Sequence, residues 1–286
     1  MAKIFFRTLL WICLLGWNGR RLAAQVLPET GTRSAAMGNA SVTQTDAWAA
    51  FNNQAGLAFL KLPTLALSTS RPFLLNELAD HAGVAAYPSG FGTVALSIQY
   101  DGFQAFNQQK IGLAYARKIS ESISGGIQFD YFNTSISNYG KAGAVSVEAG
   151  ALVRISKPLS FGFQVFNPVQ SRLGFGEQEH LPVVFRAGLT YEEADRFQLS
   201  VETEKNLSES PRFKAGLEYK IIRQLSLRGG IMTNPFISSF GLGLQLGNFQ
   251  LDLASSYHQQ LGVTPQLGIS YALAPRNKHI LIDPKL

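Results

Sequence analysis

The chain has 286 residues, of which 15% are charged, well below the roughly 25% that is typical of soluble proteins. Its formal net charge is +6, but four basic residues and the single cysteine, Cys13, lie in the first 24 positions, which we expect to be removed. The rest of the chain then has 21 basic and 19 acidic residues, which gives no electrostatic case for binding nucleic acid. Without a cysteine it also has neither a disulfide framework nor thiolate chemistry.

Residues 1–24 have the pattern of a secretory signal peptide. Lys3 and Arg7 form a basic start, an apolar stretch runs over 9–17, and Ala23 and Ala24 offer small residues before Gln25. The alternative, a lipoprotein signal that uses Cys13, is disfavoured because Ile12 stands where a small residue is needed. No 18-residue apolar run follows, so the sequence predicts no helical membrane span.

Residues 25–62 differ from the rest of the chain, because they are rich in small residues and show no strand alternation. Asp46 can cap a short helix that runs through Phe51, and a turn follows it. This stretch resembles the N-terminal signature of the PorV/PorQ-like proteins of Bacteroidetes, which belong to the FadL-like class of outer-membrane barrels. The matching residues are Gly31, Arg33, Met37, Gly38, Ala40, Asp46, Ala47, Asn53, Ala55, Gly56 and Leu57, and Gln54 stands where the family pattern has proline.

The resemblance implies that residues 25–62 form a plug-like segment inside or under a barrel. Its motif residues would be Gly31, Arg33, Met37, Gly38, Asp46, Asn53 and Gly56. It also implies a location in the outer membrane of a Gram-negative bacterium. There the protein would either take part in type IX secretion, as PorV-like members do, or pass small apolar compounds, as FadL-like members do.

Residues 63–273 alternate between apolar and polar side chains with a period of two, most clearly from Ala142 to Tyr191. Such alternation predicts strands with two different faces, and segments of about 9–11 residues suffice to cross a bilayer at a tilt. Short and generally longer connections alternate, which is typical of outer-membrane barrels. We predict fourteen strands, at about 63–69, 81–88, 91–101, 108–118, 121–133, 142–156, 159–167, 181–192, 195–205, 211–221, 224–232, 237–246, 248–258 and 265–273.

The two faces of these strands have different chemistry. Residues such as Ile98, Ile111 and Leu113 are predicted to face lipid, and most charged residues are predicted to face the lumen. Charges in a lumen have to pair or stay hydrated, because isolated burial is costly. We therefore expect a lumen charge network of Glu148, Arg154, Arg186, Glu202, Glu204, Lys214, Glu218 and Arg228.

The sequence offers no convincing catalytic, cofactor or metal site. The four histidines are scattered, without metal-ligand spacing. Glu202 and Glu204 could mimic a paired-carboxylate acid/base site, but the basic residues on neighbouring strands favour ion pairs. His258 has serines nearby without a hydrolase motif, and no helix pattern follows the glycines at 241–243, which disfavours a phosphate loop.

Together these observations predict an all-β protein, a transmembrane up-and-down β-barrel of about 14 antiparallel strands with a short N-terminal plug. The leading hypothesis is a non-enzymatic PorV/PorQ-like component associated with type IX secretion. The alternatives are a FadL-like passive channel for small hydrophobic compounds and a structural barrel that serves other proteins as a membrane partner. The expected partners are membrane lipid and either secretion-system proteins or hydrophobic small molecules. Residues 274–286 form a tail without an assigned role.

Overall fold

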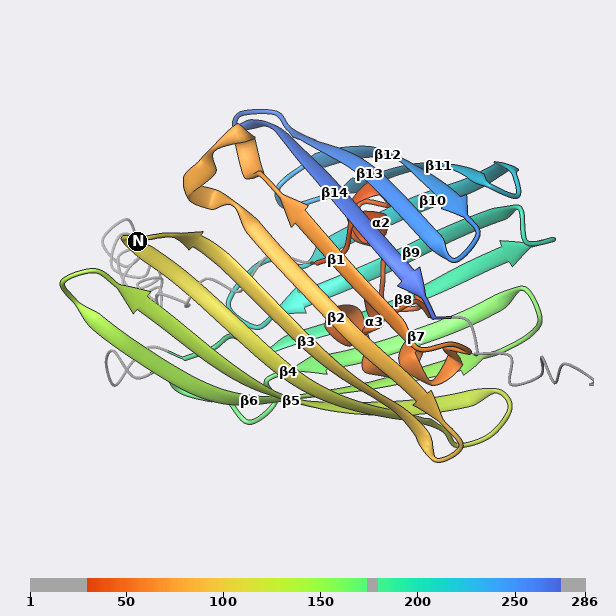
Figure 1. Ribbon diagram of the computed structural model, residues 1–286, viewed down its shortest axis with the longest axis horizontal. Helices are drawn as coiled ribbons and strands as arrows, with labels where there is room; N and C mark the ends of the chain where they lie inside the picture. The colour runs from red at the N-terminus through yellow and green to blue at the C-terminus, as the bar shows by residue number, and fades with distance from the viewer. Residues whose placement is uncertain (1–29, 174–179, 274–286) are drawn as a thin grey trace, which may run out of the picture.

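A computed structural model describes residues 30–173 and 180–273, so the predicted signal peptide and tail lie outside the described residues. Fourteen antiparallel strands follow one another around a closed barrel, and β1 pairs with β14 to complete it (Figure 1). The prediction of an all-β, fourteen-stranded up-and-down barrel is therefore confirmed. The strands are β1 (Thr64–Ser70), β2 (Asp80–Ser89), β3 (Gly92–Phe103), β4 (Phe106–Lys118), β5 (Ile123–Ile136), β6 (Gly140–Arg154), β7 (Leu159–Phe166), β8 (Val184–Glu193), β9 (Phe197–Asn206), β10 (Arg212–Ile222), β11 (Leu225–Met232), β12 (Ile237–Leu246), β13 (Phe249–His258) and β14 (Gly262–Ala272).

Several strands are longer than the sequence predicts. The expected loops at 102–107 and 134–141 are wrong at their edges, because β3 runs on to Phe103 and β5 to Ile136. In both places polar residues continue the antiparallel ladder, as in the pairs Asn107 with Ser135 and Gln108 with Thr134. Alternation of apolar and polar side chains is the signal by which a strand is predicted from sequence. These residues pair in the ladder without that alternation, so the full length of these strands was not predicted.

The two ends of the barrel differ in their connections. At one end the strands are joined by short turns, such as 223–224 and 247–248. At the other end the connections include 71–79, which holds the 3₁₀ turns η2 (Pro72–Leu74) and η3 (Asn76–Leu78), and the long segment 167–183. In outer-membrane barrels the short turns lie on the periplasmic side. We call the two ends the short-turn end and the loop end.

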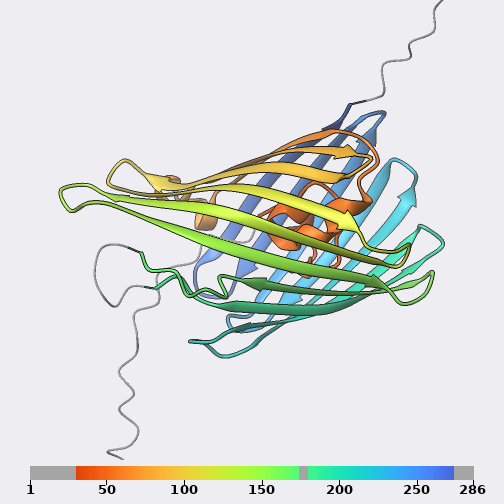
Figure 2. The same ribbon diagram turned by 90° about the horizontal axis from the view of Figure 1, so that it is seen from below.

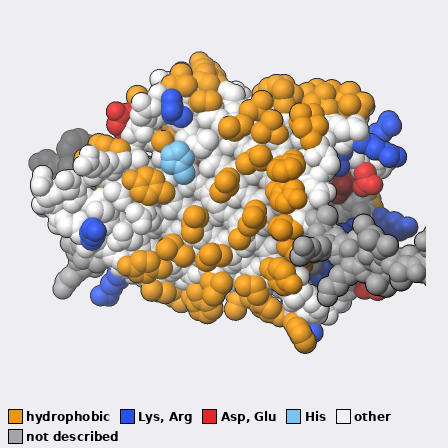
Figure 3. All heavy atoms as spheres, viewed as in Figure 1, with side chains coloured by type: hydrophobic (Ala, Val, Ile, Leu, Met, Phe, Trp, Pro, Cys, Tyr) orange, Lys and Arg blue, Asp and Glu red, His pale blue; other side chains and the backbone are white. Residues whose placement is uncertain are grey.

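The outer wall of the barrel is apolar. Leu67, Ile98, Leu113 and Phe129 are each about half exposed, and Figure 3 shows such side chains spread over the visible wall. A soluble protein rarely exposes so large an apolar surface, whereas a bilayer requires one. In the described part of the chain no helix is long and apolar enough to cross a membrane.

Residues 30–62, the plug, lie inside the barrel (Figure 2). They form the short helices α2 (Thr32–Ala36) and α3 (Ala49–Asn52) and the 3₁₀ segment η1 (Gln54–Phe59). The predicted helix from Asp46 starts later, at Ala49, although the Asp46 carboxylate does accept a hydrogen bond from the Trp48 backbone N–H at 3.0 Å. The plug packs against strands on several sides of the lumen, with η1 against β4, β5 and β6 and α2 against β12 and β13.

Candidate functional site: the plugged lumen

The barrel wall makes room for the plug with small side chains. On β1 to β4 the wall presents buried alanines, such as Ala66, Ala95 and Ala114, to an apolar cluster of the plug that includes Trp48 and Phe51. On most of the other strands it presents glycines. A Cβ atom at any of eight glycines would come within 3 Å of a plug atom, and we call these the glycine belt: Gly126, Gly150, Gly162, Gly188, Gly216, Gly230, Gly241 and Gly268.

Six glycines of the belt form cross-strand pairs. Gly126 pairs with Gly150 and Gly216 with Gly230, so that two adjacent strands open the same space. At Gly216 the nearest plug atom is the Met37 carbonyl oxygen. Glycine inside a strand often marks such a close backbone approach. The plug backbone therefore lies directly against the wall, which leaves little space for passage while the plug stays in place.

The first of three charge clusters joins the plug to β10, β11 and β13. Arg33 donates to the Glu218 carboxylate at 2.9 Å, and Arg228 donates to the same carboxylate at 2.6 Å. Arg228 also pairs with Asp252, and Arg33 pairs with Asp46 at 3.1 Å. Burial alone would lower the pKa of Arg33, but Glu218 and Asp46 outweigh it and hold that pKa above its usual value. Arg33 therefore keeps its positive charge between these carboxylates inside the barrel.

The second cluster lies on β8, β9 and β10. The Glu202 carboxylate accepts hydrogen bonds from the backbone N–H groups of Ser41 and Val42, both at 2.8 Å, so it holds the middle of the plug. Lys214 bridges Glu202 and Glu204 at 3.1 and 2.8 Å. Glu204 is further paired with Arg186 at 2.8 Å and with Arg212 at 3.2 Å.

The third cluster surrounds Lys110 of β4. Its ammonium pairs with Glu148 and lies 3.4 Å from Asp130. Glu148 also accepts from Gln54 of the plug at 2.7 Å. The rings of Phe51, Phe132 and Phe166 each lie 5.6 Å from the Lys110 nitrogen, a distance suited to cation–π attraction.

The structure brings seven of the eight residues of the predicted lumen network into these three clusters. The eighth, Arg154, lies at the short-turn end, where its guanidinium stacks on the Phe59 ring at 3.8 Å. Sequence reasoning missed Lys110, the centre of the third cluster. Lys110 could have been predicted to face the lumen, because successive side chains of a strand point to opposite faces and the next residue, Ile111, faces lipid.

The residues of the plug motif make contacts that fix the backbone of the plug. Asn53 donates to the Val42 carbonyl at 2.6 Å and accepts from the Ala55 N–H at 3.2 Å. Gly31 and Gly38 have positive φ angles of 111° and 62°, which favour glycine. A Cβ at Gly56 would strike the Gln44 carbonyl, and Met37 is fully buried.

An apolar cluster lies in the lumen between the Lys110 cluster and the loop end. We call it the lumen apolar cluster, and its residues are Phe132, Ala142, Ala144, Phe166, Leu173, Leu181 and Val184. Part of its wall is not a strand, because β6 pairs with β7 only from Glu148 to Arg154. From Glu148 toward the loop end, the segment after β7 continues the wall. Asn167 anchors this segment by donating to the Leu181 carbonyl at 2.7 Å.

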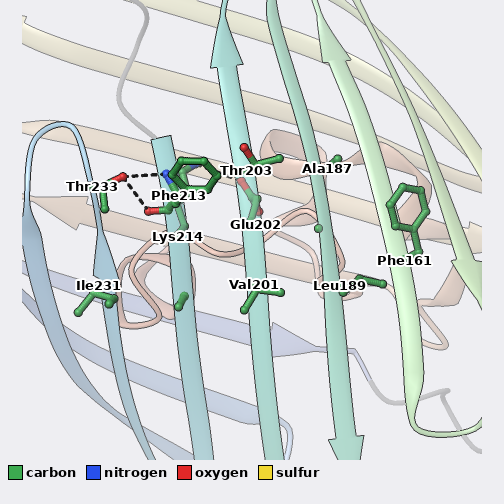
Figure 4. Close-up of a pocket in the computed structure, with 12 residues that line it drawn as sticks. Phe161, Ala187, Leu189, Val201, Glu202, Thr203, Phe213, Lys214, Ile231 and Thr233 are labelled. Atoms are coloured by element: carbon green, nitrogen blue, oxygen red, sulfur yellow. Dashed lines mark hydrogen bonds and ion pairs between the residues drawn. The ribbon is translucent and has the colours of Figure 1, made fainter. Parts of the chain in front are cut away.

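The outer wall carries a hollow of about 490 Å³ over β7 to β11. In Figure 4 the aliphatic and aromatic side chains Phe161, Leu189, Val201 and Ile231 are seen around it. The hollow forms because small side chains, such as Ala187, lie between these larger ones. Its chemistry suits a hydrocarbon chain of the bilayer.

In residues 30–173 and 180–273, no group of histidine, cysteine and carboxylate side chains is placed to hold a metal ion. The described clusters are built from paired charges and apolar contacts. Their arrangement suits holding a plug and contacting an apolar molecule.

Comparison with known proteins gave matches by structure only. No family model matches the sequence, and no curated protein matches it. Among solved structures, a FadL homologue of Pseudomonas aeruginosa is 13% identical, with a TM-score of 0.64 over 87% of this chain and 99% of that one. The chain has the same barrel fold as this FadL homologue. The monoaromatic hydrocarbon channel CymD is 12% identical, with a TM-score of 0.68 over 88% and 100% of the two chains. The Ralstonia pickettii toluene transporter TbuX is 11% identical, with a TM-score of 0.65 over 86% and 98%.

Proposed function

We propose that this protein is an outer-membrane channel for small, uncharged hydrophobic compounds, in which the plug is the internal gate. Its apolar outer wall and its barrel fold point to the outer membrane of a Gram-negative bacterium. The solved structures that it resembles are channels and transporters, including those for toluene and other monoaromatic hydrocarbons.

The lumen apolar cluster is the observation that carries this proposal. Phe132 and Phe166 are buried in this cluster together with Leu173 and Leu181. Their rings meet edge to face, with centroids 5.8 Å apart. Apolar pockets with a few polar groups are the usual sites for small hydrophobic ligands. The Lys110 ammonium lies 5.6 Å from the Phe132 and Phe166 rings of this cluster and equally far from the Phe51 ring of the plug, so it lies between the cluster and the plug.

Uptake tests this function. Cells of a Gram-negative host that lacks its own hydrophobic-compound channel would express the full chain and receive radiolabelled toluene. We expect uptake above that of the empty host, and a large reduction in the variant Leu181→Asp, which puts a charge in the lumen apolar cluster. The matched control is Leu207→Asp, because Leu207 is 57% exposed at the loop end. The milder variant Phe166→Ala serves if Leu181→Asp does not fold.

Three results bear on the proposal. Heat-modified gel mobility of each variant first establishes that its barrel is closed. Equal uptake by the wild type and the empty host would refute the channel. Equal loss in Leu181→Asp and Leu207→Asp would show that the lumen apolar cluster is not the route.

A role in type IX secretion is the second candidate, and the plug motif favours it. The residues that resemble the PorV/PorQ signature, including Arg33 and Asn53, hold the plug in the lumen. The short connections at 104–105 and 137–139 offer little surface for large cargo, which favours the channel instead. Cross-linking in native membranes separates the candidates. Recovery of secretion-system proteins would support this role or that of a structural membrane partner, whereas toluene uptake without such partners would support the channel.

A further inference from the structure

A polar cavity of about 190 Å³ opens in the lumen at the short-turn end, below the plug. Arg33 of the plug lines it on one side, and the inner faces of β10 to β13 line it on the others. It lies apart from the lumen apolar cluster, which is on the other side of the plug. The proposed passage of uncharged compounds gives this cavity no role.

The cavity has an excess of positive charge. Arg33, Lys220, Arg223 and Arg228 line it together with the Glu218 carboxylate, and Asp46 and Asp252 pair with Arg33 and Arg228 from outside the lining. The Glu218 carboxylate is already used, because it accepts hydrogen bonds from both Arg33 and Arg228. The side chains of Lys220 and Arg223 have no ion-pair or hydrogen-bond partner within the described part of the chain. Two cations therefore face the cavity without a counter-ion.

The surroundings of these two cations supply hydrogen-bond donors. Gln224 adds an amide and Ser226 adds a hydroxyl. On the neighbouring strand β12, a Cβ at Gly243 would come within 3 Å of the Arg228 guanidinium, so glycine keeps the space beside that group open. Two cations without a counter-ion, beside amide and hydroxyl groups that can donate, match an anion with several oxygen atoms.

We propose that this cavity binds a soluble compound through a phosphoryl group, with Lys220 and Arg223 as its principal contacts and the Arg228 guanidinium as its floor. A phosphoryl group carries close to two negative charges and three acceptor oxygens, which suits the excess of cations better than a monocarboxylate does. The lining side chains of β10 and β11 point into the lumen. A lipid headgroup, whose chains stay in the bilayer outside the wall, would not reach these side chains and could reach only Arg223, in the exposed turn.

Calorimetric titration of the full chain tests this site, in phosphate-free detergent at low salt and with inorganic phosphate as the probe. We expect saturable binding that is weakened about tenfold or more in Lys220→Gln/Arg223→Gln, because charge-assisted hydrogen bonds to phosphate are strong. Arg223→Gln alone, in an exposed turn, gives an independent variant if the double variant does not fold. The control is Lys157→Gln/Arg196→Gln, which removes two exposed charges from the same end and should leave phosphate binding unchanged.

Four outcomes would overturn the proposal. They are the absence of saturable binding at millimolar phosphate, an equal loss in the two double variants, acetate binding as tight as phosphate binding, and competition by phosphatidylglycerol. The last is measured in nanodiscs, with phosphatidylcholine as the reference lipid, and it would assign the site to a headgroup. None of these results depends on toluene uptake, so this site and the proposed channel are tested separately.

Discussion

Arg33 of the plug donates two hydrogen bonds to the Glu218 carboxylate of β10, at 2.9 and 3.3 Å. The two residues are 185 positions apart in the sequence, so this contact ties the beginning of the chain to the far side of the barrel. The same carboxylate holds Arg228 of β11. Glu218 therefore fixes both the plug and the wall, and loss of either partner disturbs both.

The variant Arg33→Ala should loosen the plug. It leaves Glu218 with Arg228 alone and removes the partner of Asp46, so we expect the free energy of unfolding to fall by about 1–3 kcal/mol. Planar-bilayer recordings should show a higher ionic conductance than for the wild type. The control is Arg196→Ala, an exposed turn residue. An unchanged conductance in Arg33→Ala would contradict the assigned role of the Arg33–Glu218 pair.

Gly230→Ala should displace the plug by steric overlap. The added methyl group would strike the backbone of Met37 and Gly38, and overpacking of this kind costs about 1–3 kcal/mol. The neighbouring Gly229 is the matched control, because a Cβ there would have only one neighbour, at 3.9 Å. Urea unfolding and conductance should therefore change in Gly230→Ala and stay near wild type in Gly229→Ala. Similar behaviour of the two variants would refute the glycine belt.

Lys110 and Glu148 should show strong energetic coupling. Lys110→Met leaves a buried carboxylate without its cation, which typically costs about 3–5 kcal/mol. The double variant Lys110→Met/Glu148→Gln removes both charges and should be more stable than the single-variant effects added together, by about 0.5–3 kcal/mol. A double-mutant cycle based on urea unfolding measures this difference. Additive effects would mean that the pair contributes no interaction energy.

Leu113→Lys tests whether the outer wall faces lipid. Leu113 is 55% exposed near the middle of β4, and a lysine at the bilayer midplane costs about 2–4 kcal/mol. Ile119→Lys is the control, because Ile119 lies in a turn at the short-turn end, where the cost falls to about 0–1 kcal/mol. Unfolding should be compared in liposomes. If the two lysines cost the same, the assigned depth of β4 in the bilayer is wrong.

Alternation was enough to predict the fourteen strands and their faces. Ile111 and Leu113 point outward and Glu148 points inward because side-chain direction in a strand has a period of two. Strand ends were harder to predict, since Thr134 and Ser135 continue the ladder without an apolar face. Residues 168–180 were also read only as a loop, and the predicted strand at 181–192 begins later, at Val184.

The interior of the barrel could be predicted only in part. Charge balance across neighbouring strands indicated that Glu202 and Lys214 would pair, but strand parity alone does not show which pairs also hold the plug. The bonds from Ser41 and Val42 to Glu202 depend on how a segment without strand alternation lies against strands far along the chain. The same is true of the glycine belt, where each glycine by itself has the appearance of an ordinary bend.

The glycine belt also has a consequence for suppressor genetics. At Gly126, Gly162, Gly216 and Gly230 the wall meets main-chain atoms of the plug, and those atoms are the same whichever side chain the plug carries. A point change in a plug side chain therefore cannot compensate for a lost glycine at these positions. Selection for revertants of a defective glycine variant should return the original glycine, or deletions in the plug that remove the opposing main chain.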